Sequence, residues 1–237
     1  MGASDTTGGP GQFRLGRRVP VSPKPSAFLR DSHETESFAR ALGLLCKGGE
    51  RIALTGDLGA GKTTFVRGMS SGLGVPEEEI SSPTFTVMHV HEPSDQKSGR
   101  CLVHVDAYRL EDPAELMELG WDEIVRDRRN VIVVEWPDRL GGALGENVLE
   151  LELFHSSSSG GEVPGREIVF GSSLSSDLMN KLFTKCRGCG KQIHAGVGSF
   201  PFCGNKCRMA DLGNWFDGSY SVSREIEEDD LFDPDLA

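Results

Sequence analysis

The sequence lacks long apolar runs and has no excess of positive charge. Not even ten apolar residues follow one another in the 237-residue chain, whereas a transmembrane helix needs about 20. The amino-terminal residues also lack the apolar core of a signal peptide, so we expect a cytoplasmic protein without a membrane partner. Acidic residues outnumber basic ones by 36 to 25, for a formal charge of −11. This balance excludes a generic polybasic nucleic-acid coat.

The charge is concentrated at the two ends of the chain. Residues 224–237 carry seven acids against one arginine, whereas the first thirty residues have a net charge of +4. The opening stretch is rich in glycine and proline and shows no helical or strand period. We therefore expect a flexible N-terminal arm over residues 1–30 and an acidic, disordered tail over residues 223–237.

Between these ends, short apolar runs alternate with helical patterns. Alternation of this kind predicts an α/β fold with a mostly parallel sheet and flanking helices over residues 31–172. Residues 173–184 form a possible linking helix, and a small zinc-ribbon-like module is expected over residues 185–222. The expected strands are 51–55, 85–91, 101–106 and 130–135 with a closing hairpin of 148–154 and 166–170, and the expected helices begin near 31 and cover 63–73, 113–119 and 122–126.

A glycine-rich motif joins the first of these strands to the helix that follows it. Its pattern is G-x-x-x-x-G-K-T, and the backbone N–H groups of such a loop point inward at phosphate oxygens. Lys62 then reaches the β- and γ-phosphates, and the Thr63 hydroxyl is placed for Mg²⁺. The strand before it and the helix after it favour ATP binding over an ordinary glycine-rich turn. The predicted phosphate-binding residues are Gly56, Asp57, Leu58, Gly59, Ala60, Gly61, Lys62 and Thr63.

Two acids stand at the carboxyl ends of predicted strands, the edge at which open α/β sheets bind ligands. Asp106 ends one strand and Glu135 ends the next, so both are candidates for holding Mg²⁺ and orienting water. A helix cap or a surface carboxylate is the alternative for each. Thr84, after Ser82 and Pro83, is a candidate switch residue or part of a plain strand-entry turn. Trp136 belongs to the core or covers the nucleotide. His89, His91 and His104 are expected to face solvent or pack in strands rather than bind metal.

Four of these segments together resemble the TsaE family, the P-loop ATPases of bacterial tRNA threonylcarbamoyladenosine synthesis. The segments are Gly56–Thr64, Ser82–Phe85, His104–Leu110 and Val134–Trp136, in that order, and the resemblance covers residues 34–170. It implies an ATPase that works with the TsaD and TsaB proteins on tRNA. It also implies that Thr64 contacts phosphate, that Glu135 rather than Asp106 is the direct Mg²⁺ ligand, and that Arg166 lies near the nucleotide.

Four cysteines near the carboxyl end have the spacing of a zinc site. A C-x-x-C pair is followed, after thirteen residues, by a C-x-x-x-C pair, and each pair can hold one side of a tetrahedral Zn²⁺. Four thiolates leave no open position, so the site is expected to be structural. Two disulfides are the alternative, which a cytosolic setting disfavours. Because four cysteines suffice, His194 is expected to be a loop residue rather than a ligand. The expected ligands are Cys186, Cys189, Cys203 and Cys207.

The cysteine segment resembles the YacG family of small zinc proteins, described as DNA gyrase inhibitors. Residues 186–191, 202–208 and 211–215 carry the resemblance, together with Gly218 to Tyr220, although Arg187 and Gly204 depart from its usual proline and serine. The resemblance implies a contact with the gyrase B subunit. The charge of the acidic tail, which also carries Leu231 and Phe232, suggests that the tail extends this contact or mimics DNA.

Other functions fit parts of this pattern. A small-molecule P-loop kinase would share the phosphate loop but needs an acceptor pocket and arginine-bearing lid segments, and no clear lid is seen. An ATP-sensing regulator that binds gyrase would use both halves of the chain. A zinc module that docks RNA is a third possibility, although its local charge is too small to predict phosphate binding.

Overall fold

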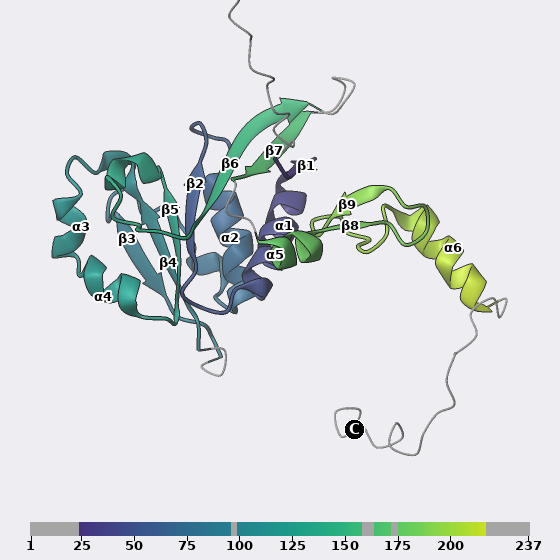
Figure 1. The fold of residues 1–237 in the computed structure, drawn as a ribbon, viewed down its shortest axis with the longest axis horizontal. Coiled ribbons are helices and arrows are strands. Elements are labelled where there is room, and N and C mark those ends of the chain that lie inside the picture. The colour runs from purple at the N-terminus through teal and green to yellow at the C-terminus, as the bar shows by residue number, and fades with distance from the viewer. Residues whose placement is uncertain (1–23, 96–98, 158–163, 172–174, 217–237) are drawn as a thin grey trace, which may run out of the picture.

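A computed structural model describes residues 24–95, 99–157, 164–171 and 175–216 (Figure 1). Its main sheet has seven strands in the order β1-β7-β6-β2-β5-β4-β3. The central strands β6, β2, β5 and β4 are parallel, and antiparallel strands complete both edges. This confirms the expected α/β class. The strands are β1 (Ser26–Leu29), β2 (Arg51–Thr55), β3 (Met88–His91), β4 (Cys101–Asp106), β5 (Asn130–Glu135), β6 (Val148–Ser157) and β7 (Pro164–Phe170).

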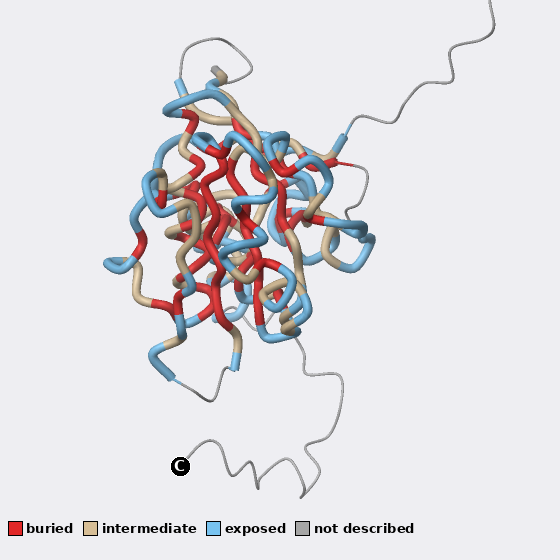
Figure 2. Tube along the Cα trace, turned by 90° about the vertical axis from the view of Figure 1, so that its left-hand side faces the viewer, coloured by how far each residue is buried: buried red, intermediate tan, exposed pale blue. Residues whose placement is uncertain are grey.

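Helices cover both faces of this sheet, which explains why the central strands are apolar without alternation. Ile52 and Leu54 of β2 belong to the core beneath the first two helices, whereas Ala53 between them faces the opposite core. Figure 2 shows that buried residues run through the middle of the molecule. A strand buried on both faces needs apolar side chains at every position. The helices are α1 (Ser32–Leu45) and α2 (Lys62–Leu73) on one face and α3 (Ala114–Glu118) and α4 (Trp121–Arg126) on the other, with 3₁₀ turns at Glu77–Glu79, Ala107–Arg109 and Pro137–Leu140.

Glycine lets α1 and α2 approach closely. A Cβ atom at Gly68 of α2 would lie 2.3 Å from the carbonyl oxygen of Glu36 in α1, and one at Gly43 of α1 would lie 2.4 Å from that of Met69. The helix backbones therefore touch at these positions. This contact fixes α2, whose first residues belong to the glycine-rich motif.

Two edge strands differ from the sequence expectation. Ser26–Leu29 forms β1 against β7, although we expected this stretch to belong to the N-terminal arm. Four residues that pair with a strand more than 130 positions later leave no local periodic signal. The strand expected over 85–91 begins only at Met88, because Pro83 accepts hydrogen bonds from Thr86 and Val87 in a preceding turn. The rest of the expected arm, residues 1–23, and the acidic tail lie outside the described residues.

The carboxyl-terminal segment forms a second, smaller unit beside the main sheet (Figure 1). Helix α5 (Ser176–Leu182) leads into a second, two-stranded sheet of β8 (Phe183–Lys185) and β9 (Gln192–His194), and α6 (Asn205–Phe216) follows (Figure 1). We call residues 183–194 the cysteine hairpin, because its turn carries Cys186 and Cys189. Within the described ranges, no helix is long and apolar enough to cross a membrane.

Candidate functional site

The glycine-rich motif forms a tight loop between β2 and α2, as predicted. Gly56, Gly59 and Gly61 have φ values of 136°, 81° and 101°, which only glycine adopts at low cost. A Cβ atom at Gly56 would also lie 2.0 Å from the carbonyl oxygen of Leu153 on β6. The loop is thereby held against the sheet, and its following helix directs its N-terminus toward the loop.

Lys62 is buried at the centre of this loop. Its Nζ donates to the carbonyl oxygens of Gly56 at 2.7 Å and Asp57 at 3.0 Å, and lies 4.1 Å from the centre of the Trp136 ring. Burial lowers the pKa of the Lys62 amine, while the carboxylates of Glu135, Asp106 and Asp57 act in the opposite direction. A buried cation beside a glycine-rich loop is suited to the terminal phosphates of a nucleotide.

Thr63 and Glu135 meet across the gap between α2 and β5. The Thr63 hydroxyl donates to Oε1 of Glu135 at 3.0 Å. The same oxygen lies 3.0 Å from Nε2 of His104, whose side chain is fully buried in β4. We expected His104 only to pack in a strand or face solvent. The available signal was its position as a polar residue inside an otherwise apolar, buried strand, because such a group needs a partner.

Asp106 lies beside Glu135, because the two residues are register partners in parallel strands β4 and β5. Its Oδ2 accepts hydrogen bonds from the hydroxyls of Ser82 at 2.8 Å and Thr84 at 2.6 Å. Its Oδ1 accepts from the backbone N–H of Tyr108 at 3.1 Å. The structure thus places Thr84, the expected switch residue, in hydrogen-bond contact with Asp106, the expected acid. Asp106 also caps the 3₁₀ turn at Ala107–Arg109, which was its alternative role.

Trp136 and Arg166 border the same cavity, which has a volume of about 350 Å³. Trp136 has a left-handed backbone with φ 60°, and its half-buried ring packs against Tyr108 with ring centres 5.2 Å apart. Arg166 of β7 donates from Nε to the carbonyl oxygen of Ala60 at 3.1 Å. Of the other predicted residues, Leu58, Gly59, Gly61 and Thr64 line the cavity, whereas Ala60 is buried behind it.

This set of oxygen donors fits Mg²⁺. The Thr63 hydroxyl and two carboxylates lie at one end of a cavity that also contains the lysine and the glycine-rich loop. Mg²⁺ binds a few protein oxygens together with phosphate oxygens. The cavity therefore has the polar groups needed to bind a nucleoside triphosphate together with Mg²⁺.

The four predicted cysteines lie together, and none forms a disulfide. Their Sγ atoms all lie within 4.8 Å of one another, with Cys203 3.6 Å from both Cys189 and Cys207. A tetrahedral zinc with bonds of about 2.3 Å places its sulfurs about 3.8 Å apart. Burial raises the pKa of the Cys186 thiol, but the backbone N–H groups of Cys203, Cys189 and Gly188 outweigh it and lower that pKa to about 6. The cluster fits a structural Zn²⁺.

Comparison with known proteins finds relatives for both parts of the chain. The model of the family "Threonylcarbamoyl adenosine biosynthesis protein TsaE" matches residues 29–166, and that of "DNA gyrase inhibitor YacG" matches residues 184–233. A TsaE of Treponema pallidum is 37% identical over 125 residues, which cover 52% of this chain and 87% of the relative. A TsaE of Streptomyces coelicolor is 45% identical over 117 residues, which cover 49% and 76%.

Among solved structures, the crystal structure of Bacillus subtilis YdiB aligns with a TM-score of 0.47 and 28% identity, covering 62% of this chain and 84% of that one. Both resemblances inferred from the motifs are confirmed by the family matches. The chain therefore belongs to the TsaE family of threonylcarbamoyl adenosine biosynthesis proteins, with a YacG-like module at its carboxyl end.

Proposed function

We propose that this chain is a Mg²⁺-dependent ATP hydrolase of tRNA threonylcarbamoyladenosine synthesis that works with TsaD and TsaB. The observation that carries the proposal is the meeting of Thr63 with Glu135, 3.0 Å apart, in a cavity that also contains Lys62 and Asp106. This combination supplies phosphate binding, metal binding and a carboxylate for water in one place. The family match supports the pathway.

Each residue has a distinct task in this proposal. The loop N–H groups and the Lys62 ammonium bind the β- and γ-phosphates and neutralise charge that develops as the terminal P–O bond breaks. Thr63 and Glu135 would hold Mg²⁺, which would polarise the phosphate oxygens. Asp106 orients the attacking water and accepts its proton. Thr84 donates to Asp106, so movement of the Ser82–Thr84 segment changes how that carboxylate points.

The test is ATP hydrolysis by the full chain, alone and with TsaD, TsaB and tRNA. Lys62→Ala is expected to abolish turnover, whereas Lys47→Ala, which removes an exposed lysine elsewhere, leaves it unchanged. Asp106→Asn is expected to lower kcat by a factor of about 100 or more while the chain still binds nucleotide, because general-base catalysis contributes about 10² to 10⁴. Turnover that the partners do not stimulate would count against the tRNA pathway.

The kinase alternative receives no support from the two family matches. It predicts phosphate transfer to a small acceptor without the tRNA partners. Screening the same preparation against small hydroxyl and carboxyl acceptors, with Lys62→Ala as the control, distinguishes it from hydrolysis.

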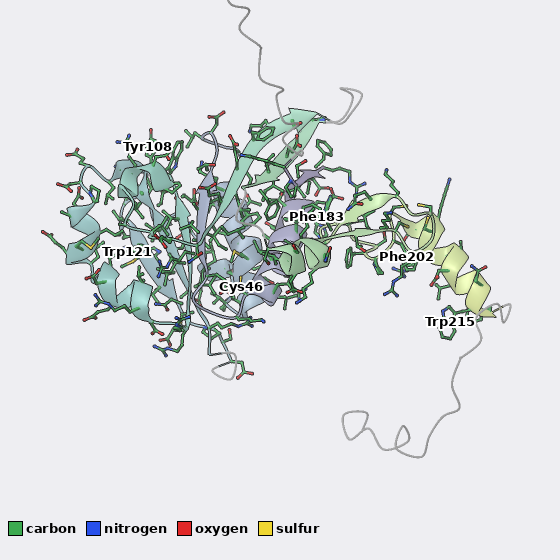
Figure 3. The ribbon with its side chains drawn as sticks, in the orientation of Figure 1. Cys46, Tyr108, Trp121, Phe183, Phe202 and Trp215 are labelled. Carbon is green, nitrogen blue, oxygen red and sulfur yellow. The ribbon has the colours of Figure 1, made fainter. Side chains whose placement is uncertain are left out.

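A second proposal concerns the YacG-like module, which we infer binds the gyrase B subunit. Helix α6 supports it, because Met209, Trp215 and Phe216 are 61%, 62% and 88% exposed. Figure 3 shows Trp215 near the outer end of this helix. Exposed apolar side chains that gather on one short helix favour a protein partner. Met209→Ala should weaken capture of purified gyrase B by the full chain, whereas Met117→Ala, which is 44% exposed on α3, should not. Equal capture by both variants would remove α6 from the contact.

A further inference from the structure

The cysteine hairpin shares a hydrophobic core with the sheet. Its first residue, Phe183, is 8% exposed, and its ring centre lies 5.9 Å from Phe38 of α1 and 5.6 Å from Phe170 of β7 (Figure 3). Leu182, directly before it, is fully buried in the same cluster. At the other end of the hairpin, Cys186 and Cys189 join the metal site. One rigid element therefore connects the cysteine cluster to the core of the sheet.

His194, the last residue of the hairpin, bonds to the first strand of the sheet. Its Nε2 lies 3.0 Å from the carbonyl oxygen of Phe28 in β1, and its Nδ1 accepts from the N–H of Gly196 at 3.2 Å. Because Nδ1 accepts, the ring proton is on Nε2, which donates to Phe28. The ring also packs edge-on against Phe38, with centres 5.6 Å apart. We expected His194 in a loop, but it lies in β9.

The neutral form of His194 agrees with these contacts. Burial lowers its pKa, the hydrogen bond to Phe28 and the charge of Glu34 act in the opposite direction, and Arg30 adds to the lowering. Glu34 is itself held by Arg30, which donates to it from both the backbone and the side chain. These hydrogen bonds between Arg30 and Glu34 hold the short connection from β1 to α1 in place, next to the docked hairpin.

From β1 the connection reaches the phosphate loop in two steps. Phe28 and Leu29 are register partners of Glu167 and Arg166 in β7. Arg166 then donates to the carbonyl oxygen of Ala60, and a Cβ atom at Gly61 would lie 2.7 Å from its Nε. The arginine therefore rests directly on the loop that is expected to bind phosphate.

We propose that the cysteine hairpin is a positioning element for the phosphate loop: His194 holds β1, β1 holds β7, and β7 presents Arg166 to the loop. Zinc held by the four cysteines would stiffen the outer end of the hairpin and so support the same chain of contacts. The YacG-like module thereby sets the nucleotide affinity of the TsaE module. This inference rests on the proposed nucleotide site, although not on hydrolysis.

The first test measures binding of a fluorescent ADP analogue with excess Mg²⁺ to the zinc-loaded full chain. His194→Ala should weaken binding about fivefold, as expected from the loss of one hydrogen bond. His194→Gln, which keeps an N–H donor, should stay within about twofold, and His33→Ala, an exposed histidine of α1, should not change binding. In ATP turnover, KM should rise for His194→Ala while kcat stays nearly constant, because Arg166 touches the loop rather than the reacting atoms. Unchanged affinity in His194→Ala would overturn the proposal.

The second test uses amide hydrogen exchange without nucleotide, so a chain that fails to hydrolyse ATP still tests the inference. Removing zinc with a chelator selective for it over Mg²⁺ should speed exchange in residues 26–29 and 56–62 as well as in the hairpin. If zinc removal changed amide hydrogen exchange only in residues 183–216, the proposed coupling between the cysteine hairpin and the phosphate loop would be contradicted. His194→Ala with zinc bound should reproduce the faster exchange at 56–62, which covers the case in which metal removal unfolds the whole chain.

Discussion

His104 offers a sharp test of the proposed catalytic geometry. Its side chain is fully buried, and its Nε2 lies 3.0 Å from the Glu135 oxygen that also accepts from Thr63. Since a carboxylate only accepts, Nε2 carries the proton in this pair. Its Nδ1 has no hydrogen-bond partner within the part of the chain that the structure describes. The histidine therefore contributes one hydrogen bond, aimed at Glu135.

Replacing His104 with leucine removes that donor at similar volume. A hydrogen bond to a charged group contributes about 1.5–3 kcal/mol. Because this bond holds Glu135 in its proposed Mg²⁺-binding position, kcat should fall about 10- to 100-fold. KM for ATP should change little, because His104 does not line the phosphate cavity. His104→Gln retains an N–H donor at the corresponding distance along its side chain and should recover most of the activity.

The assay is steady-state ATP hydrolysis with the Tsa partners over a range of Mg²⁺ concentrations, together with thermal unfolding of each variant. Wild-type kcat in His104→Leu would refute the positioning role. Equal loss in the leucine and glutamine variants, with both melting at the wild-type temperature, would also refute it, because shape rather than hydrogen bonding would then be responsible.

Three further predictions concern stability. Phe183→Ala should cost about 3–5 kcal/mol in denaturant unfolding, whereas Phe216→Ala, 88% exposed on α6, should cost less than about 0.5 kcal/mol. Gly68→Ala should destabilise the chain by about 1–3 kcal/mol by pressing on the α1 backbone, whereas Gly213→Ala in open space on α6 should be neutral or stabilising. Because the pKa of His194 is lowered in the folded chain, its contribution is complete above the unfolded value of about 6.5 and is lost as pH falls below it. Wild type should therefore lose more stability than His194→Gln between pH 7.5 and 5.5, and equal losses would contradict the assignment.

The centre of the sheet and the phosphate loop were predictable because their signals are local. The G-x-x-x-x-G-K-T pattern fixes a loop conformation within eight residues, and apolar runs such as Asn130–Glu135 indicate strands covered on both faces. The meeting of Asp106 with Glu135 also followed from the sequence, since the carboxyl ends of neighbouring parallel strands lie at one edge. The link from Glu135 to His104 required the register between strands, which no local pattern supplies.

The docking of the cysteine hairpin was not predictable for a related reason. Its contacts join Phe28 to His194, which are 166 positions apart, and Phe38 to Phe183. Contacts between residues so far apart produce no periodic pattern in the local sequence. Residues 173–184 were expected to link two modules, and a linker would be exposed. Leu182 and Phe183 instead lie in the core beneath α1. The two family matches end at residue 166 and begin at residue 184, so Leu182 and Phe183 lie between them. This connecting segment packs into the core of the TsaE-like part, close to the strand β7 that carries Arg166.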